Sequence, residues 1–413
     1  MNHPSEPIAP TLRGVAEHRA AVLELARVTG TDEVDVGAGL GRVLARDVTA
    51  AGSLPAWDSS AMDGYAVRGA DLARSSADSP AVLDVVGEAA AGVPSAVPVA
   101  PGTAVRIMTG APVPAGADAV VRQEDVARHG ARVSIGRPAH RGEHIRPAGD
   151  DVRAGERVLA AGADLGPAQL AAAVSAGARS LVVRRRPRVA VLSTGAELVA
   201  AGGALGPAQI HDSNSVLLAA AATEAGAEVV YRDGVTDDVA ALRTALAELD
   251  GAVDLVVTSG GVSVGDHDVV REALTGPVSF VRVAMQPGKP QGSGRLAAGT
   301  PVVCLPGNPV SAFVSFEVFV RPLLRTMLAA AAVEQRSGWG VADDAWRVPA
   351  DREQYMPVRL EDAATDLPRV RRAVPGGSGS HLVAGLAAAQ GLAVVPAHVR
   401  HVRPGDRLRV RWL

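Results

Sequence analysis

The sequence predicts an α/β multidomain protein, in which a parallel αβα layer is flanked by smaller β-rich units. Residues 185–332 alternate apolar strands with helical stretches, which is the pattern of a parallel sheet covered by helices on both faces. Residues 52–139 and 333–413 carry short apolar runs separated by glycine and proline, which is typical of compact all-β units. The length of 413 residues allows roughly two to four domains of ordinary size.

The first 51 residues are predicted to form one discontinuous domain with residues 140–184, a linker and dimerisation unit. Apolar residues at helical spacing predict a helix that begins near Val15 and ends before Gly30, and a second short helix over 39–45. The later segment contains an alanine-rich helix followed by a strand. Because a short helix needs a packing partner, we expect this one to pack on the N-terminal helix.

The composition narrows the function classes. Hydrophobic residues make up 47% of the chain, so a sizeable core can form. A net charge of −3 and an aromatic content of 3% argue against a nucleic-acid binder or an anionic-membrane binder. The single cysteine, Cys304, excludes disulfides within the chain, and its expected role is packing. No long apolar run and no secretory leader pattern occur, so we expect a cytoplasmic protein.

Four unusual loops fall at one edge of the sheet predicted for residues 185–332. The loops at 193–199, 258–268 and 305–313 each follow an apolar strand, and the carboxyl ends of parallel strands meet where ligands bind. The fourth loop carries Lys289, the single lysine among 41 basic residues. Lysine presents its charge as a compact ammonium group, which the larger planar guanidinium of arginine cannot imitate. The alternative is a chance surface lysine.

The loop TSGGVSVGDHD has the composition of a phosphate cradle. Gly260 and Gly261 let backbone amides approach a ligand, and Ser259 and Ser263 add hydroxyl groups. Asp268 would repel a phosphate unless a divalent cation lies between them, so the loop implies Mg²⁺. The alternative is a sharp connection that simply needs glycine.

Two further loops carry candidate groups. The turn LPGNPVS precedes a helix, and its rigid prolines expose a helix N-terminus that favours an anion; the alternative is a stiff connection. In the predicted β unit, Asp58 either orients a metal-bound water or caps a turn. The ten histidines show no metal-ligand spacing, which argues against a histidine metal site.

These motifs resemble the MoeA family of molybdopterin molybdenumtransferases, which includes the E domain of gephyrin. The matching stretches follow the family's order over nearly the whole chain: GRVLARDVTA, PAWDSSAMDGYAVR, GTAVRIMTGAPVPAGADAVVRQEDV, RRPRVAVLSTGAEL, SNSVLL, TSGGVSVGDHD, PGKP and LPGNPVS. The resemblance implies four parts: a linker domain (1–51 and 140–184), a β domain (52–139), a molybdopterin-binding αβα domain (185–332) and a C-terminal β-barrel-like domain (333–413). It also implies a homodimer, whose active site lies where the αβα domain of one subunit faces the β domain of the other.

The resemblance further implies a reaction of molybdenum cofactor biosynthesis. Molybdate would be inserted into adenylylated molybdopterin, with Mg²⁺-assisted cleavage of the pyrophosphate and release of AMP. By resemblance, the catalytic residues are Asp58, Thr109, Asp268 and Lys289, and the metal ligands are Asp237 and Asp268. The substrate-binding residues implied in the same way are Glu197, Asp237, Ser259, Gly260, Gly261, Ser263, Pro306, Gly307, Asn308, Pro309, Arg352 and Ser380. The resemblance also implies that Lys289, Arg352 and Ser380 bind molybdate.

Three positions depart from the family pattern and keep other hypotheses open. Ala196 stands where the family often has an aspartate, Gln286 where a second basic residue is frequent, and Pro357 where an arginine is frequent. One alternative is a gephyrin-like dimeric scaffold that binds partner peptides, with weak or no catalysis. Another is a molybdopterin-adenylyltransferase-like activity, which would turn over ATP. The expected partners are small-molecule substrates, the adenylyltransferase of the pathway and molybdoenzyme chaperones, with no nucleic acid and no membrane.

Overall fold

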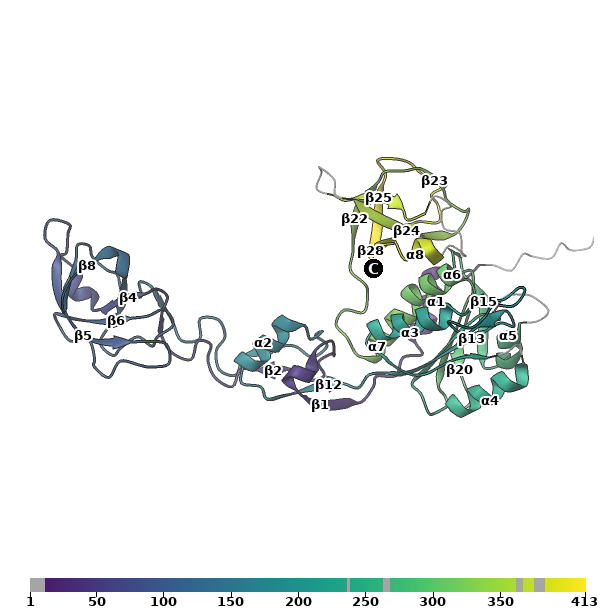
Figure 1. Cartoon of the computed structure of the whole chain (residues 1–413), viewed down its shortest axis with the longest axis horizontal. Helices are drawn as coiled ribbons and strands as arrows, with labels where there is room; N and C mark the ends of the chain where they lie inside the picture. Colours follow the sequence, from purple (N-terminus) through teal and green to yellow (C-terminus); the bar gives the residue numbers. More distant parts are fainter. Residues whose placement is uncertain (1–11, 236–237, 263–267, 362–366, 375–382) are drawn as a thin grey trace, which may run out of the picture.

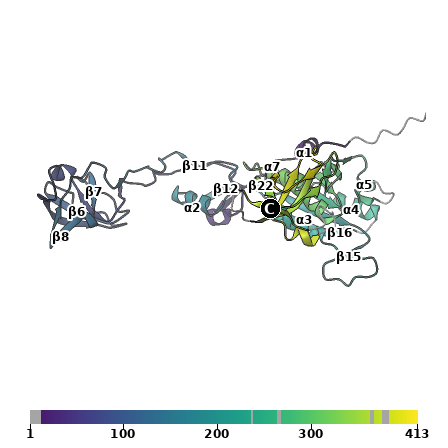
Figure 2. The same cartoon turned by 90° about the horizontal axis from the view of Figure 1, so that it is seen from above.

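The computed structural model describes residues 12–235, 238–262, 268–361, 367–374 and 383–413. The chain is elongated, with a β unit at one end and a helix-covered sheet with a small barrel at the other (Figures 1 and 2). The polypeptide runs through a thin middle region twice, once toward the β unit and once back. Within the described ranges no helix is long and apolar enough to cross a membrane. The predicted α/β multidomain class is confirmed.

The β unit contains one six-stranded sheet in the order β7-β4-β6-β5-β9-β8. Its strands are β4 (Gly64–Val67), β5 (Ala81–Ala89), β6 (Thr103–Ile107), β7 (Ala119–Arg122), β8 (Val126–His129) and β9 (Arg132–Ile135). Tyr65, Leu83 and Ile135 belong to one buried cluster, and Val105 and Val120 to a second. The pair β3 (Ser59–Ser60) and β10 (Ile145–Arg146) joins this unit to the middle region.

Two segments far apart in the sequence form the middle region. The antiparallel pairs are β1 (Thr31–Asp35) with β12 (Ser180–Arg184), and β2 (Val48–Thr49) with β11 (Arg157–Leu159). Helix α2 (Pro167–Ser175) and the 3₁₀ turn η1 (Val36–Gly39) pack on these strands. The helix predicted over 39–45 is wrong, because Val43 and Leu44 form extended bridges to the returning segment.

The helix-covered sheet has the strand order β16-β13-β17-β21-β20-β18. The four parallel strands are β13 (Arg188–Thr194), β16 (Glu228–Val235), β17 (Leu255–Ser259) and β21 (Pro301–Leu305). The last two strands, β20 (Pro290–Arg295) and β18 (Val278–Arg282), are antiparallel, so the sheet is not purely parallel as predicted. The short turn from β20 to β21 has no room for the crossover that a parallel pair requires.

Helices cover both faces of this sheet. One face carries α3 (Asn214–Glu224), α6 (Pro309–Ser315), a π-helical segment η4 (Phe316–Val320) and α7 (Arg321–Met327). The other face carries α4 (Val239–Leu249) and α5 (Val269–Leu274). Cys304 is fully buried on the α4 side, and burial raises the pKa of its thiol to about 12, as expected for a packing residue.

Helix α1 (Val15–Leu23) packs on η4 and α7, not on α2 (Figure 1). Its buried residues are His18 and Val22, and Val22 belongs to the core that contains Phe319 and Leu323. The prediction that α1 and α2 pack together is therefore wrong. Ala173 of α2 packs instead in the core of the middle region.

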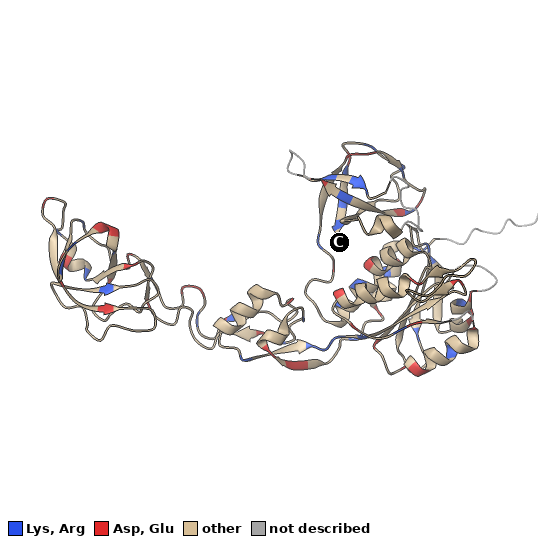
Figure 3. Cartoon of the chain, viewed as in Figure 1, with Lys and Arg blue, Asp and Glu red and all other residues tan. Residues whose placement is uncertain are grey.

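The C-terminal strands close into a five-stranded barrel, because β24 pairs with both β25 and β26, β22 with β25 and β28, and β26 with β28. These strands are β22 (Ser337–Ala342), β24 (Glu353–Glu361), β25 (Arg369–Arg372), β26 (Gly391–Val395) and β28 (Arg407–Trp412). A short pair, β23 (Trp346–Arg347) with β27 (His401–Val402), and helix α8 (Val383–Leu386) complete the unit. Basic residues mark several barrel strands (Figure 3). Tyr355 and Leu392 enter the core under α1 and α7, so the barrel is packed on the helix-covered sheet.

His18 provides a pH test of the packing of α1. Its side chain is fully buried, its ring meets Phe319 edge-on at a centroid distance of 4.8 Å, and neither ring nitrogen has a hydrogen-bond partner among the described residues. Burial, with a smaller effect of Arg13, lowers the pKa of His18 from 6.5 to about 4. In the unfolded chain the ring takes up its proton near pH 6.5. Above that pH the ring is neutral in both states, so His18 does not lower the free energy of unfolding there. That free energy is expected to fall by roughly 3 kcal/mol as the pH drops from 6.5 to 4.

Urea unfolding at several pH values between 7.5 and 4.5 checks this expectation. The variant His18→Leu should lose most of the dependence between pH 6.5 and 4.5, whereas His129→Gln, a change at an exposed histidine, should keep it. An unchanged pH dependence in His18→Leu would assign the acid sensitivity to other groups.

Candidate active site

A cavity of about 680 Å³ opens at the carboxyl ends of β13, β17 and β21. This edge of a parallel sheet is where ligands bind, and the volume suits a small molecule. Much of the wall comes from the four loops that the sequence places there. The polar and glycine residues of the wall include Thr194, Gly195, Glu197, Asp212, Asn214, Ser259, Gly260, Gly261, Asp268, Gln286, Gly288, Lys289, Gly307, Asn308 and Ser311, with Pro306 and Pro309 beside them.

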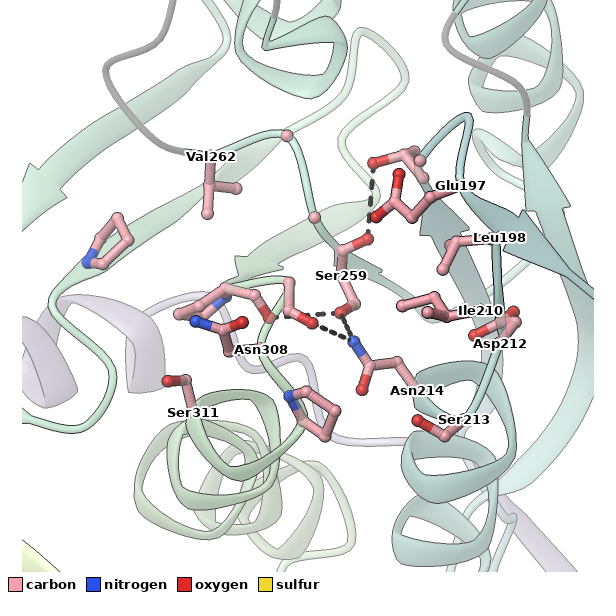
Figure 4. Close-up of a pocket in the computed structure, with 18 of the residues that line it drawn as sticks. Glu197, Leu198, Ile210, Asp212, Ser213, Asn214, Ser259, Val262, Asn308 and Ser311 are labelled. Atoms are coloured by element: carbon pink, nitrogen blue, oxygen red, sulfur yellow. Dashed lines mark hydrogen bonds between the residues drawn. The ribbon is translucent and has the colours of Figure 1, made fainter. Parts of the chain in front are cut away.

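Asn214 ties the floor of the cavity together (Figure 4). Its amide nitrogen, at the start of α3, donates to the Ser259 hydroxyl at 2.8 Å and to the Gly307 carbonyl at 2.6 Å. The Ser259 hydroxyl donates in turn to the Pro306 carbonyl at 3.2 Å. One side chain thus links the end of β17, the turn before α6 and the start of α3. The proton of Ser259 is committed within the protein, so this residue supports the floor.

The two glycines after β17 are required by close packing. Gly260 and Gly261 have φ values of +96° and +61°. A Cβ at Gly260 would lie 2.5 Å from the Thr194 carbonyl oxygen, and one at Gly261 would lie 2.9 Å from the Val270 amide nitrogen. Both contacts are with protein atoms, so the sharp connection accounts for these glycines. The phosphate cradle stays a prediction, and its Ser263 lies outside the described residues.

Lys289 lies on a loop that a buried glutamine braces. Gln291, fully buried, donates from its amide nitrogen to the Gly288 carbonyl and to the Ser315 hydroxyl, each at 2.7 Å. Lys289 itself is half-buried in the cavity wall. Burial, followed by the nearby Arg352 and Arg282, lowers the pKa of its ammonium group. The lysine is therefore held in a cationic environment, which favours a bound anion.

Arg352 approaches the same wall from the C-terminal barrel. Its Nη1 donates to the Gln286 side-chain oxygen at 3.2 Å, and Gln286 lines the cavity. The structure thus brings Arg352 near Lys289, although they are distant in sequence. Ser380, the third residue expected to bind molybdate, lies outside the described residues.

Among the residues that the structure describes, three carboxylates line the cavity: Glu197, Asp212 and Asp268. In the described part of the chain, no three potential ligand side chains form a metal cluster. Mg²⁺ does not need one, since it commonly takes one or two carboxylates and fills its other positions with water and phosphate oxygens. The donor set therefore fits Mg²⁺ held by Asp268 together with a phosphate ligand. Asp237, the second predicted ligand, lies outside the described residues.

Asp58 and Thr109 belong to the β unit and do not reach the cavity of their own chain (Figure 1). The Asp58 carboxylate accepts a hydrogen bond from the Ala148 amide at 2.8 Å. The amide and hydroxyl of Thr109 both donate to Asp63 at 2.7 Å, and these bonds lower the pKa of the Asp63 carboxyl. Their distance from this cavity agrees with the arrangement that the resemblance implies, in which the β domain of one subunit faces the αβα domain of the other, and their catalytic roles stay a prediction.

Sequence reasoning assigned no role to Asn214, Asp212 or Gln291. A signal for the first two exists in the polar run HDSN between the predicted strand and helix, where a helix start meets the ligand edge. Nothing in the sequence distinguishes Gln291, because its role depends on two backbone turns meeting in space.

Comparison with known proteins gives matches along most of the chain. Residues 13–177 match the MoeA N-terminal region (domains I and II), residues 190–326 a probable molybdopterin binding domain, and residues 340–412 the MoeA C-terminal region (domain IV). Molybdopterin molybdenumtransferase 2 of Mycobacterium tuberculosis H37Rv is 42% identical over 97% of this chain and 99% of its own length. Molybdopterin molybdenumtransferase 1 of the same strain is 35% identical over the same shares. A crystal structure of the molybdopterin biosynthesis MoeA protein from Pyrococcus horikoshii OT3 superposes with a TM-score of 0.85 at 26% identity, covering 98% of this chain and all of that one.

Proposed function

The chain belongs to the MoeA family and is a molybdopterin molybdenumtransferase of molybdenum cofactor biosynthesis, and we propose that its sheet-edge cavity inserts molybdenum from molybdate into adenylylated molybdopterin with release of AMP. The observation that supports this proposal most directly is the pairing of two kinds of group in one cavity. Lys289, with Arg352 beside it, offers cations to a dianion, while Asp268 lies in the same wall. Such a combination suits a reaction between an oxyanion and a pyrophosphate.

The cation side of the cavity would bind molybdate. A tetrahedral dianion needs directed donors, and an ammonium with a planar guanidinium provides them from different directions. The loop after β17, which begins with Gly260 and Gly261, and the turn before α6 would hold the nucleotide end of the substrate. A water molecule would add to one phosphorus of the pyrophosphate as the bridging P–O bond breaks, so that AMP leaves and molybdopterin keeps its own phosphate. One molybdate oxygen would take up the two protons of the dithiolene thiols and leave as water as the two sulfurs bind molybdenum.

Asp268 would hold Mg²⁺, with Asp237 as the second proposed ligand. The ion would neutralise charge on the pyrophosphate while its bridging bond breaks. Asp268 is the residue immediately before α5, so its backbone is anchored to the helix whose Val270 lies against Gly261.

A direct assay tests the proposal. The protein is incubated with adenylylated molybdopterin, molybdate and Mg²⁺, and both AMP release and cofactor formation are followed. We expect AMP release that depends on molybdate, and no turnover of ATP. Binding of the nucleotide without AMP release at millimolar molybdate would contradict the proposal and favour the scaffold alternative, which the full-length match to transferases does not favour.

We also propose that a second copy of the chain supplies Asp58 and Thr109 to the cavity. Both residues lie on the β unit, far from the cavity of their own chain, and the side chain of each forms a hydrogen bond there. In a homodimer that joins the β unit of one subunit to the cavity of the other, each active site would use both chains. The proposal thus explains why the expected catalytic groups are divided between two ends of an elongated molecule.

Subunit mixing checks this arrangement. Asp58→Asn and Lys289→Met should each be nearly inactive alone. After the two variants are unfolded together and refolded, a mixed dimer has one site with both changes and one site with neither, so we expect up to about a quarter of wild-type activity from random pairing of intact sites. No recovery, with mixed dimers demonstrated by a tag on one variant, would contradict the shared site.

A further inference from the structure

The geometry points to Gln286 as a positioning residue: we infer that it holds Arg352 of the C-terminal barrel beside Lys289 and thereby sets the affinity for molybdate. The inference deepens the proposed function and rests on it. In this proposal Gln286 does not touch the reacting atoms. Its effect passes through the guanidinium of Arg352.

Backbone pairing brings the two residues together. Strand β19 (Met285–Gln286) precedes the Lys289 loop and pairs in parallel with the start of β24. The Glu353 amide donates to the Ala284 carbonyl at 2.9 Å. The residue just before Glu353 is Arg352, so the pairing between the barrel and the helix-covered sheet delivers the arginine to the cavity rim.

A side-chain hydrogen bond then fixes the guanidinium. The Gln286 oxygen accepts from Nη1 of Arg352 at 3.2 Å. The Nε of Arg352 is buried and has no hydrogen-bond partner among the described residues. An arginine has five donors in a planar group, so pairing one of them with the Gln286 oxygen restricts where the remaining donors point. Gln286 therefore selects one orientation of a long and otherwise flexible side chain.

The neutral amide is the suitable chemical type for this position. A carboxylate would also orient Arg352, but it would neutralise the charge that a dianion requires. A basic residue would add charge but repel Arg352 and leave it without an acceptor. Gln286 orients the cation and preserves its charge. The site consequently keeps two cations, Lys289 and Arg352, close enough that the pKa of Lys289 is lowered by its neighbour as well as by burial.

Two nearby cations in a half-buried site repel each other until an anion binds. Molybdate, with two negative charges, relieves that repulsion, whereas adenylylated molybdopterin is expected to use other parts of the cavity. Loss of the Gln286 acceptor should thus weaken molybdate binding selectively. A merely structural defect would change the KM of both substrates.

The test compares Gln286→Met, Arg352→Met and the double variant. Methionine has nearly the length of both aliphatic stems and no acceptor of comparable strength. We expect Gln286→Met to raise the KM for molybdate about ten-fold, the size of effect typical for a hydrogen bond to a charged group. The KM for adenylylated molybdopterin should stay within about two-fold, and Arg359→Met, a change at an exposed arginine on the same strand, should behave like wild type.

The double variant decides whether Gln286 acts through Arg352. If it does, Gln286→Met adds nothing to the effect of Arg352→Met, since the side chain that it positions is already gone. Additive effects, an equal rise in both KM values, or wild-type behaviour of Gln286→Met would each overturn the inference. Calorimetric titration with molybdate alone gives a second measurement that needs no turnover: binding weakened in Gln286→Met supports the inference, and unchanged binding overturns it. An enzyme that binds molybdate but releases no AMP would instead contradict the proposed function.

Discussion

Replacing Lys289 with methionine is expected to lower kcat/KM for molybdate about 100-fold or more, because it removes a directed charge from a half-buried anion site. The loop should survive the change, since Gln291 braces it through Gly288 and Ser315 without using the lysine side chain. The KM for adenylylated molybdopterin should change much less. Steady-state AMP release at varied molybdate measures both quantities.

The variant Lys289→Arg separates charge from geometry. Arginine keeps the charge, but its planar fork is larger and would face Arg352 and Arg282, which already lower the pKa of the lysine. We expect it to recover only part of the lost activity. Full activity of Lys289→Arg would show that charge alone suffices, and full activity of Lys289→Met would remove the lysine from the anion site.

The single lysine also permits a direct binding measurement. Apart from the N-terminal amine, Lys289 is the only primary amine of the chain, so an amine-reactive reagent reports on one side chain. Because its pKa is lowered, it should react faster at neutral pH than an ordinary lysine. Molybdate should protect it from labelling. Equal labelling with and without millimolar molybdate would contradict binding at this residue.

The strand-edge loops were predictable because the alternation of strands and helices fixes which chain ends meet in a parallel sheet. That logic placed Glu197, Asp268 and the turn before α6 in one cavity, as the structure does. The predicted packing of α1 on α2 was wrong, because helical spacing shows which face of a helix is apolar but not which core that face enters. The buried His18 of α1 gave no sign that the partner would be Phe319.

The two outer strands of the sheet and the Gln286–Arg352 contact were not predictable for a related reason. Both depend on a short connection or a pairing between units, β20 to β21 in the first case and β19 to β24 in the second. Sequence patterns describe each strand by itself and carry no record of which neighbour it will pair with. The chemistry of Gln286 becomes visible only when Arg352, distant in the sequence, lies beside it.

Replacing Arg321 with methionine is expected to destabilise the helix-covered sheet by about 3–5 kcal/mol, the cost of stranding a buried charge. The Glu317 side chain is fully buried in the π-helical segment, and Arg321 holds both of its oxygens, at 2.6 Å and 3.0 Å. Arg321 also donates to Glu224 at 2.8 Å. Burial raises the pKa of Glu317 even with the arginine present. Hydrogen exchange of the amides in residues 309–327 measures the loss. This continuous helical stretch begins directly after the turn that lines the cavity.

The pH dependence distinguishes a stranded charge from lost packing. Without Arg321, the folded-state pKa of Glu317 rises further above its unfolded value, so the folded variant holds a proton that the unfolded chain releases. Stability of Arg321→Met should then fall as pH rises from 5 to 8, whereas a packing defect would cost the same at each pH. Arg325→Met, one turn later, breaks a pair with the exposed Asp164 and should cost about 1 kcal/mol or less. If the double change Glu317→Leu and Arg321→Met is as unstable as Arg321→Met alone, the loss comes from packing and not from the unpaired carboxylate.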